Sequence, residues 1–190
     1  RLDEFDHSLS MFNPNSVISK INRNDSVVTD SLFERMYQEA YVISELSNGA
    51  FDITVAPLVN AWGFGTSRRE SEKAKGDEAM VDSIKAYVGY EKIRLNSHHL
   101  EKDDERITLD ASAIAKGYAC DIIADLLREQ GCENLLVDIG GEVVLQGVND
   151  KGKAWSVGIT RPTIDGTGTE EELQEIITSN GLCMATSGNY

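Results

Sequence analysis

Apolar residues between Ser31 and Gly49 recur at the spacing of one helical face. This pattern predicts a helix that begins at Ser31, where Glu34 would complete a capping box, and that ends at Asn48 and Gly49. The side chains expected to form its buried stripe are Leu32, Met36, Ile43 and Leu46. Earlier in the chain, residues 5–12 show the same spacing and predict a helix that breaks at residues 13–15, because Pro14 disfavours helical backbone before it.

Other stretches show helical or alternating patterns. Residues 80–88 predict a third helix that ends at Gly89. Alternation from Gly49 to Ala56 is typical of a strand, and Pro57 interrupts it. Further strands are expected at 142–147, 155–160 and 173–178.

The stretch from Arg106 to Gly141 predicts a strand, a helix and a second strand. Residues 106–110 alternate as in a strand, helical spacing then continues to Gly131, and residues 135–139 form the next apolar run before the Gly140-Gly141 turn. The whole chain is therefore predicted to be α+β, with a mainly antiparallel sheet and flanking helices.

This layout puts Asp110 at the carboxyl end of a strand and Lys116 in the first turns of the following helix. Helix N-termini attract anions because their first N–H groups lack partners and the helix dipole is positive there. Ala113, Lys116 and Gly117 share one face, so the pattern allows a phosphate site. The alternative is that Lys116 is a solvated surface lysine and that the small residues serve packing.

Composition narrows the range of functions. The chain has 190 residues and a formal net charge of -14, which argues against nucleic acid or an anionic membrane surface as a partner. No apolar run is long enough to span a bilayer. The 3 cysteines are too widely separated to predict a disulfide framework, and the 3 histidines suggest no zinc site. Residues 62–65 pair aromatic rings with glycine, which suits either a ring-stacking surface or a packed loop.

Four segments of the chain carry a common pattern. They are Ala50-Phe51-Asp52 with the residues that follow to Gly65, Leu109 to Asp121, Val137 to Glu142, and Ala185 to Tyr190. In their order and spacing these segments resemble the ApbE family of FAD:protein FMN transferases, and the resemblance extends over essentially the whole chain.

The resemblance implies an enzyme that uses FAD as its substrate and Mg²⁺ as its cofactor. The hydroxyl of a Thr or Ser on a target flavoprotein would attack the FMN-side phosphorus, and AMP would leave. Alternatives are an FAD pyrophosphatase that gives FMN and AMP, and a non-catalytic FAD-binding module. The resemblance also implies the site residues: the Ala113 carbonyl as a magnesium ligand, and FAD contacts from Phe12, Ala50, Phe51, Asp52, Asp110 and Lys116.

We expect residues 1–190 to form a single ApbE-like domain that is incomplete at both ends. In the family, the motif with the acidic metal ligands and the catalytic aspartate follows the segment that ends here at Tyr190. The isolated fragment is therefore expected to be inactive. The resemblance further implies an extracytoplasmic, periplasmic protein of the lipoprotein type, attached to the membrane only through an upstream lipid anchor.

Overall fold

The computed structural model describes residues 1–63, 78–160 and 173–187, in two compact units, Arg1–Ala115 and Lys116–Tyr190. Several predictions concern residues outside the described part: Phe64 and Gly65, the charged insert from Ser67 to Gly76, the loop from Asp165 to Glu172, and the last three residues. Whether the chain is a single domain remains a prediction.

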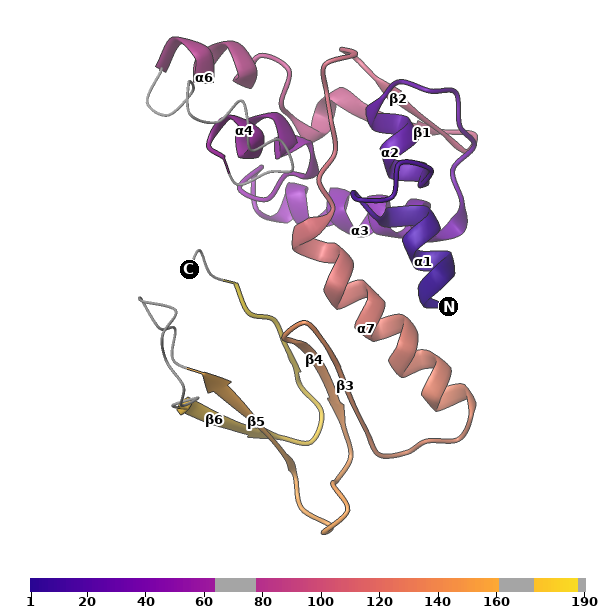
Figure 1. The fold of residues 1–190 in the computed structure, drawn as a ribbon, viewed down its shortest axis with the longest axis vertical. Helices are drawn as coiled ribbons and strands as arrows, with labels where there is room; N and C mark the ends of the chain where they lie inside the picture. The colour runs from indigo at the N-terminus through magenta and orange to yellow at the C-terminus, as the bar shows by residue number, and fades with distance from the viewer. Residues whose placement is uncertain (64–77, 161–172, 188–190) are drawn as a thin grey trace. The chain divides into compact units, whose positions relative to one another are not determined.

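The first unit is mostly helical (Figure 1). Fully buried side chains from its helices, hairpin and connecting segments form its core, among them Leu9, Ile18, Phe33, Ile93 and Leu109. The elements are α1 (Leu2–Leu9), α2 (Val17–Asn22), α3 (Ser31–Leu46), the 3-10 helix η1 (Ile53–Val55), α4 (Ala56–Ala61), α6 (Glu78–Lys85), the 3-10 helix η2 (Tyr90–Lys92), and the antiparallel hairpin β1 (Ile93–Asn96) and β2 (His99–Lys102).

Helix α3 occupies the predicted range, but the predicted capping box is wrong. Its N-cap is Asp30, whose Oδ1 accepts hydrogen bonds from Phe33 N at 2.8 Å and from the buried Ser8 Oγ at 2.7 Å. Glu34 instead accepts a hydrogen bond from Thr29 Oγ1 at 2.7 Å. Asp30, one residue before the predicted cap, therefore caps α3, because its carboxylate also accepts a hydrogen bond from the buried hydroxyl of Ser8 in α1.

The predicted stripe of α3 is correct only at Met36. Leu32 is half-buried, Ile43 is exposed, and Leu46 is 80% exposed. The buried positions are Phe33, Met36, Tyr37, Ala40 and Ser44. The buried face of α3 is thus rotated from the predicted one. The apolar pattern did not indicate this face because two of its positions, Ala40 and Ser44, carry a small and a polar side chain.

The predicted strand at residues 106–110 is also wrong, although its alternating burial is real. Ile107 and Leu109 are fully buried, but none of their backbone hydrogen bonds goes to a neighbouring strand: Ile107 N donates to Asp104 O at 3.1 Å, and the other groups bond to side chains. Asn22 accepts from Leu109 N at 2.7 Å and donates to Leu109 O at 2.9 Å, and Lys102 Nζ donates to Ile107 O at 2.9 Å. Asp110 therefore does not end a strand.

The predicted strand between Gly49 and Ala56 is replaced by η1 and the start of α4. Pro57 lies in the first turn of α4 rather than interrupting a strand. Proline is tolerated there because the first N–H groups of a helix have no intrahelical partner.

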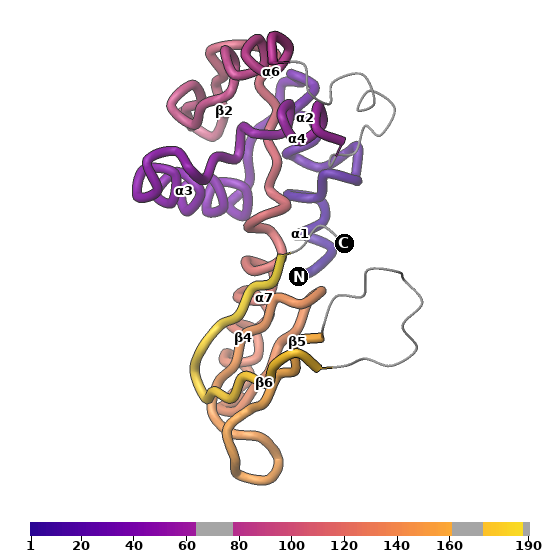
Figure 2. Tube along the Cα trace, turned by 90° about the vertical axis from the view of Figure 1, so that its left-hand side faces the viewer, coloured from indigo at the N-terminus to yellow at the C-terminus, as the bar shows by residue number. Residues whose placement is uncertain are grey.

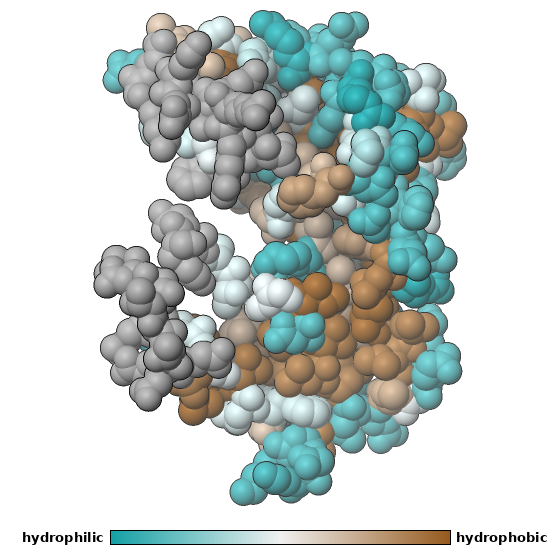
Figure 3. Space-filling model, viewed as in Figure 1, coloured by the Kyte–Doolittle hydropathy of each residue, from teal (hydrophilic) through white to brown (hydrophobic). Residues whose placement is uncertain are grey.

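The second unit confirms the predicted strands (Figures 1 and 2). Helix α7 begins in the first unit, and most of it packs on a sheet in the order β3-β4-β7 through a core of Cys120, Ala124, Leu135, Val137 and Val144. Its elements are α7 (Ser112–Glu129), β3 (Leu135–Ile139), β4 (Glu142–Gln146), β7 (Cys183–Met184) and the antiparallel pair β5 (Trp155–Thr160) and β6 (Leu173–Ser179). Figure 3 shows apolar side chains gathered over the strands of this unit.

Replacing Asp30 with alanine tests the observed cap of α3. Asp30→Ala removes the acceptor of both Phe33 N and Ser8 Oγ, so we expect the free energy of unfolding to fall by about 1–2 kcal/mol. Ser31→Ala is the matched control, because Ser31 is exposed and is not the N-cap, and we expect a change below about 0.5 kcal/mol. Urea denaturation measures both; a larger loss for Ser31→Ala would contradict the assignment.

Candidate functional site

A cavity of about 390 Å³ in the first unit brings together five of the residues that the resemblance implied. It is lined by Ala50, Phe51, Asp52, Asp110 and Ala113, and also by Gly49, Val55, Leu58, Val59, Val88 and Ser112. The volume lies within the usual range of roughly 300–1,000 Å³ for small-molecule sites. The lining combines aliphatic and aromatic residues with two aspartates and a serine, so the cavity suits a ligand with an apolar ring and a polar part.

The carboxylate of Asp52 joins two segments that are distant in sequence at the wall of this cavity. Its Oδ1 accepts from Thr54 N and Thr54 Oγ1, both at 2.7 Å, and its Oδ2 accepts from Tyr90 N at 2.8 Å. Thr54 Oγ1, which is fully buried, also accepts from Gly89 N at 2.7 Å. Asp52 therefore caps η1 and holds the chain at Gly89 and Tyr90 against it.

Gly89 is required by this connection. Its φ of 151° lies in a region that residues with a side chain rarely adopt, so a substitution here would strain the backbone. The neighbouring Tyr90 ring makes an edge contact with Tyr41, with the ring centroids 5.5 Å apart. Burial, followed by the charge of Glu45, raises the pKa of the Tyr90 hydroxyl, so this phenol stays neutral and contributes packing.

Asp110 connects the same wall to the start of α7. Its backbone N donates to Ile53 O at 2.7 Å, and its Oδ1 accepts from Ser112 N at 2.8 Å. Among the described residues, no hydrogen bond reaches its other carboxylate oxygen, Oδ2. This oxygen is the polar group that Asp110 can offer to a ligand or a cation at the cavity.

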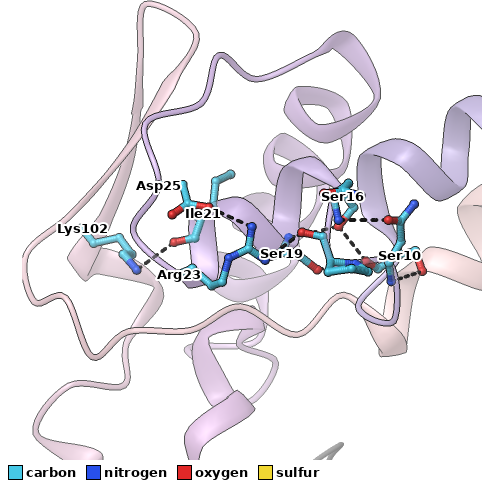
Figure 4. Close-up of polar contacts among 10 residues, drawn as sticks. Ser10, Ser16, Ser19, Ile21, Arg23, Asp25 and Lys102 are labelled. Carbon is cyan, nitrogen blue, oxygen red and sulfur yellow. Dashed lines mark hydrogen bonds and ion pairs between the residues drawn. The ribbon is translucent and has the colours of Figure 1, made fainter.

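Phe12 lies at a different cavity of the first unit, of about 330 Å³, whose lining includes Ala56 and Asn60 of α4. Phe12 is 84% exposed, while hydrogen bonds hold its loop. Ser16 Oγ and Ser19 Oγ both donate to Ser10 O, at 2.7 Å and 3.3 Å (Figure 4). The structure therefore does not bring Phe12 together with the other candidate residues.

Lys116 belongs to the second unit and contacts the turn between β3 and β4. Its Nζ donates to Gly140 O at 3.1 Å and lies 2.5 Å from Glu142 Oε2. Nearby, Cys120 Sγ donates to Glu142 O at 3.1 Å, and burial raises the pKa of this thiol. Cys120 is thus a packing residue, whereas Lys116 carries an ammonium group that is partly open to solvent.

Two residues of the cavity lining carry oxygen donors that a hard cation could use. The Asp110 carboxylate and the Ala113 carbonyl are oxygen donors of the kind that Mg²⁺ prefers. Within residues 1–63, 78–160 and 173–187, however, no three His, Cys, Asp or Glu side chains come together as a metal cluster. The donors present are suitable for Mg²⁺, and a complete coordination shell needs further groups.

Sequence reasoning missed three residues at the cavity wall of the first unit and one beside Lys116 in the second unit. Gly89 was predicted only as the end of a helix, and Thr54 and Tyr90 were not singled out, because contacts between residues 52–54 and 89–90 leave no periodic signal. Glu142 was noted only as part of a family segment. The local sequence signal for Glu142 was that it directly follows two adjacent glycines, Gly140 and Gly141, which predict a turn.

Comparison with known proteins gives matches along the entire chain. The model of the ApbE family matches residues 1–190. A FAD:protein FMN transferase of Vibrio cholerae is 36% identical, with 100% of this chain and 56% of the relative aligned; one of Haemophilus influenzae is 34% identical with the same coverage. The chain thus spans about half the length of these curated relatives.

Solved structures agree with these matches. The flavin transferase ApbE from Vibrio cholerae aligns with a TM-score of 0.82 and 33% identity, covering 99% of this chain and 60% of that one. The apo form of the Pseudomonas stutzeri flavinyl transferase ApbE gives a TM-score of 0.82 and 27% identity, covering 99% and 58%. The α+β fold expected from sequence is therefore confirmed.

Replacing Thr54 with valine tests the connection at the cavity wall. Thr54→Val keeps the side-chain shape but leaves Gly89 N without its buried acceptor, so we expect a loss of about 1–3 kcal/mol in the free energy of unfolding and faster hydrogen exchange at the Gly89 amide. Thr178→Val, on the exposed face of β6, is the control. Its hydroxyl bonds only to the exposed Ser156 Oγ among the described residues, at 3.1 Å, and water can replace this bond, so stability should change by less than about 0.5 kcal/mol. Equal losses in the free energy of unfolding for the two substitutions would show that the bond from Gly89 N to Thr54 Oγ1 does not stabilise the fold.

Proposed function

Because the chain belongs to the ApbE family, we propose that the protein transfers FMN from FAD to a target flavoprotein. The observation that carries this proposal is the cavity on which Ala50, Phe51, Asp52, Asp110 and Ala113 converge. Relatives named FAD:protein FMN transferase support it, and they are 32–36% identical over the whole chain.

The lining of the cavity divides the tasks of binding FAD. Phe51, Val55, Leu58 and other apolar side chains offer a surface for a flat ring system. The Asp110 end lies next to the first turn of α7, where the helix dipole favours negative charge, and it would receive the pyrophosphate. Asp52 would act by keeping the wall in shape, since its carboxylate already accepts three hydrogen bonds.

The charges at the cavity support a role for Mg²⁺. Its lining carries the carboxylates of Asp52 and Asp110, and no lysine or arginine is among the described residues that line it. A pyrophosphate placed there would be repelled unless a cation offset the negative charges. Asp110 and the Ala113 carbonyl would hold Mg²⁺ together with other groups, and Mg²⁺ bound there would supply positive charge to offset the negative charge of the pyrophosphate.

The proposed reaction is a displacement at phosphorus. The hydroxyl oxygen of a Thr or Ser on the acceptor forms a bond to the FMN-side phosphorus, and the bond from this phosphorus to the bridging oxygen breaks. AMP leaves with that oxygen and the electron pair, and the hydroxyl proton passes to a base. Lys116 would offer its ammonium group to a phosphate oxygen, and Phe12 would contact the edge of the bound FAD.

We also propose that the protein acts outside the cytoplasm, attached to the membrane by a lipid anchor upstream of Arg1. Among the described residues, no helix combines the length and the apolar character needed to cross a bilayer. The proposal rests on the family resemblance and is tested by locating the full-length protein in membrane fractions before and after removal of the lipid.

Mass spectrometry tests the proposed transfer. The full-length protein is incubated with FAD, Mg²⁺ and a flavoprotein acceptor, and we expect the acceptor to gain the mass of FMN less one water, with no gain when Mg²⁺ is chelated. Free FMN and AMP without an acceptor adduct would mean a pyrophosphatase, and bound, unchanged FAD would mean a binding module. Either result would contradict the proposal.

Asp110→Asn tests the role of the cavity in this transfer. Asparagine can still accept from Ser112 N, so the fold is kept while the charge is lost. We expect the transfer rate to fall about tenfold or more, since a charged hydrogen-bonding group contributes roughly 1.5–3 kcal/mol. Asp82→Asn, at an exposed position of α6, is the matched control and should leave the rate unchanged.

A further inference from the structure

Glu142 is a buried carboxylate for which neither the family resemblance nor the comparisons give a role. It is 9% exposed, and its Oε2 is shielded from solvent. Strand register places it opposite Ile139 on the sheet face that packs against α7. Burying a carboxylate is costly unless it is paired, so its partner is informative.

Its partner is Lys116. The Lys116 Nζ lies 2.5 Å from Glu142 Oε2, and within the described residues no oriented hydrogen bond reaches this oxygen, so the pairing is one of charge. The same ammonium donates to Gly140 O at 3.1 Å. An ammonium has three N–H donors, and the side chain of Lys116 remains 47% exposed, so a donor is left that can point to a ligand.

The surroundings hold Glu142 in place. Its backbone oxygen accepts from Cys120 Sγ, one helical turn after Lys116 on α7. The turn before it is fixed by Gly141 N donating to Asp138 Oδ1 at 3.1 Å, and Gly140 lies beneath the Lys116 stem, where an added Cβ would be 3.5 Å from Lys116 Cδ. The two acceptors of the ammonium therefore sit on a fixed turn.

We propose that Glu142 is a positioning residue for FMN transfer: it fixes the Lys116 ammonium so that its remaining donor meets the phosphoryl group in the transition state. The inference rests on the proposed function. A free lysine side chain samples many rotamers, and anchoring the ammonium at two points removes that freedom before the substrate binds. The Glu142 carboxylate also offsets part of the positive charge of Lys116. Glu142 therefore adds little to the affinity for FAD in the ground state.

A double-mutant cycle on kcat tests this role. In the full-length protein, Glu142→Gln should lower kcat about tenfold while the KM for FAD stays within about twofold, because placement of the ammonium matters most in the transition state. Lys116→Met should lower kcat about a hundredfold, and adding Glu142→Gln to it should cost nothing more. Glu129→Gln, exposed near the end of α7, is the matched control and should behave as wild type.

Thermal unfolding without FAD tests the pair independently of activity. Lys116→Met leaves the Glu142 carboxylate buried and unpaired, so we expect Tm to fall by about 6 °C or more, and the added Glu142→Gln should restore most of this loss. If the effects of the two substitutions on kcat or on Tm were additive, the positioning role of Glu142 would be overturned, but the proposed FMN transfer would not. A wild-type protein that transfers no FMN would overturn the proposed function and, with it, this role.

Discussion

The candidate site depends on one carboxylate that accepts three hydrogen bonds. Asp52 caps η1 through Thr54 and holds Tyr90, and Thr54 in turn holds Gly89. Without these bonds, residues 49–55 and 88–90 would have no polar connection at the cavity wall, and buried N–H groups would lose their acceptors. The sequence uses a charged residue here because a carboxylate has several lone pairs and can satisfy more donors than a hydroxyl or an amide.

The sequence predicted helices and strands well where residues with a periodic apolar pattern also have their backbone hydrogen bonds within a helix or a sheet. The hairpin of β3 and β4 follows from two apolar runs around two glycines, and the long helix α7 follows from its spacing. Residues 106–110 show the opposite case: alternation correctly reports which side chains are buried, but Asn22 and Lys102 provide the backbone partners that a neighbouring strand would otherwise supply. The pattern of burial alone does not reveal this difference.

The candidate site was partly predictable, and for a different reason. The family resemblance named residues at positions 50–52, 110 and 113, and these line one cavity in the first unit. Lys116 belongs to the second unit and Phe12 to another cavity, so their contacts with FAD remain predictions. Thr54, Gly89 and Glu142 escaped notice because their importance comes from contacts across 22 to 35 residues of chain, which local patterns do not record.

Hydrogen exchange of the full-length protein, with and without FAD and Mg²⁺, would test most directly whether the cavity held by Asp52 binds the flavin nucleotide. The account predicts added protection of the amides at residues 50–52 and 111–113, while the β1–β2 hairpin at residues 93–102, which does not line that cavity, stays unchanged. Saturating FAD that leaves residues 50–52 and 111–113 as exposed to exchange as before would contradict it.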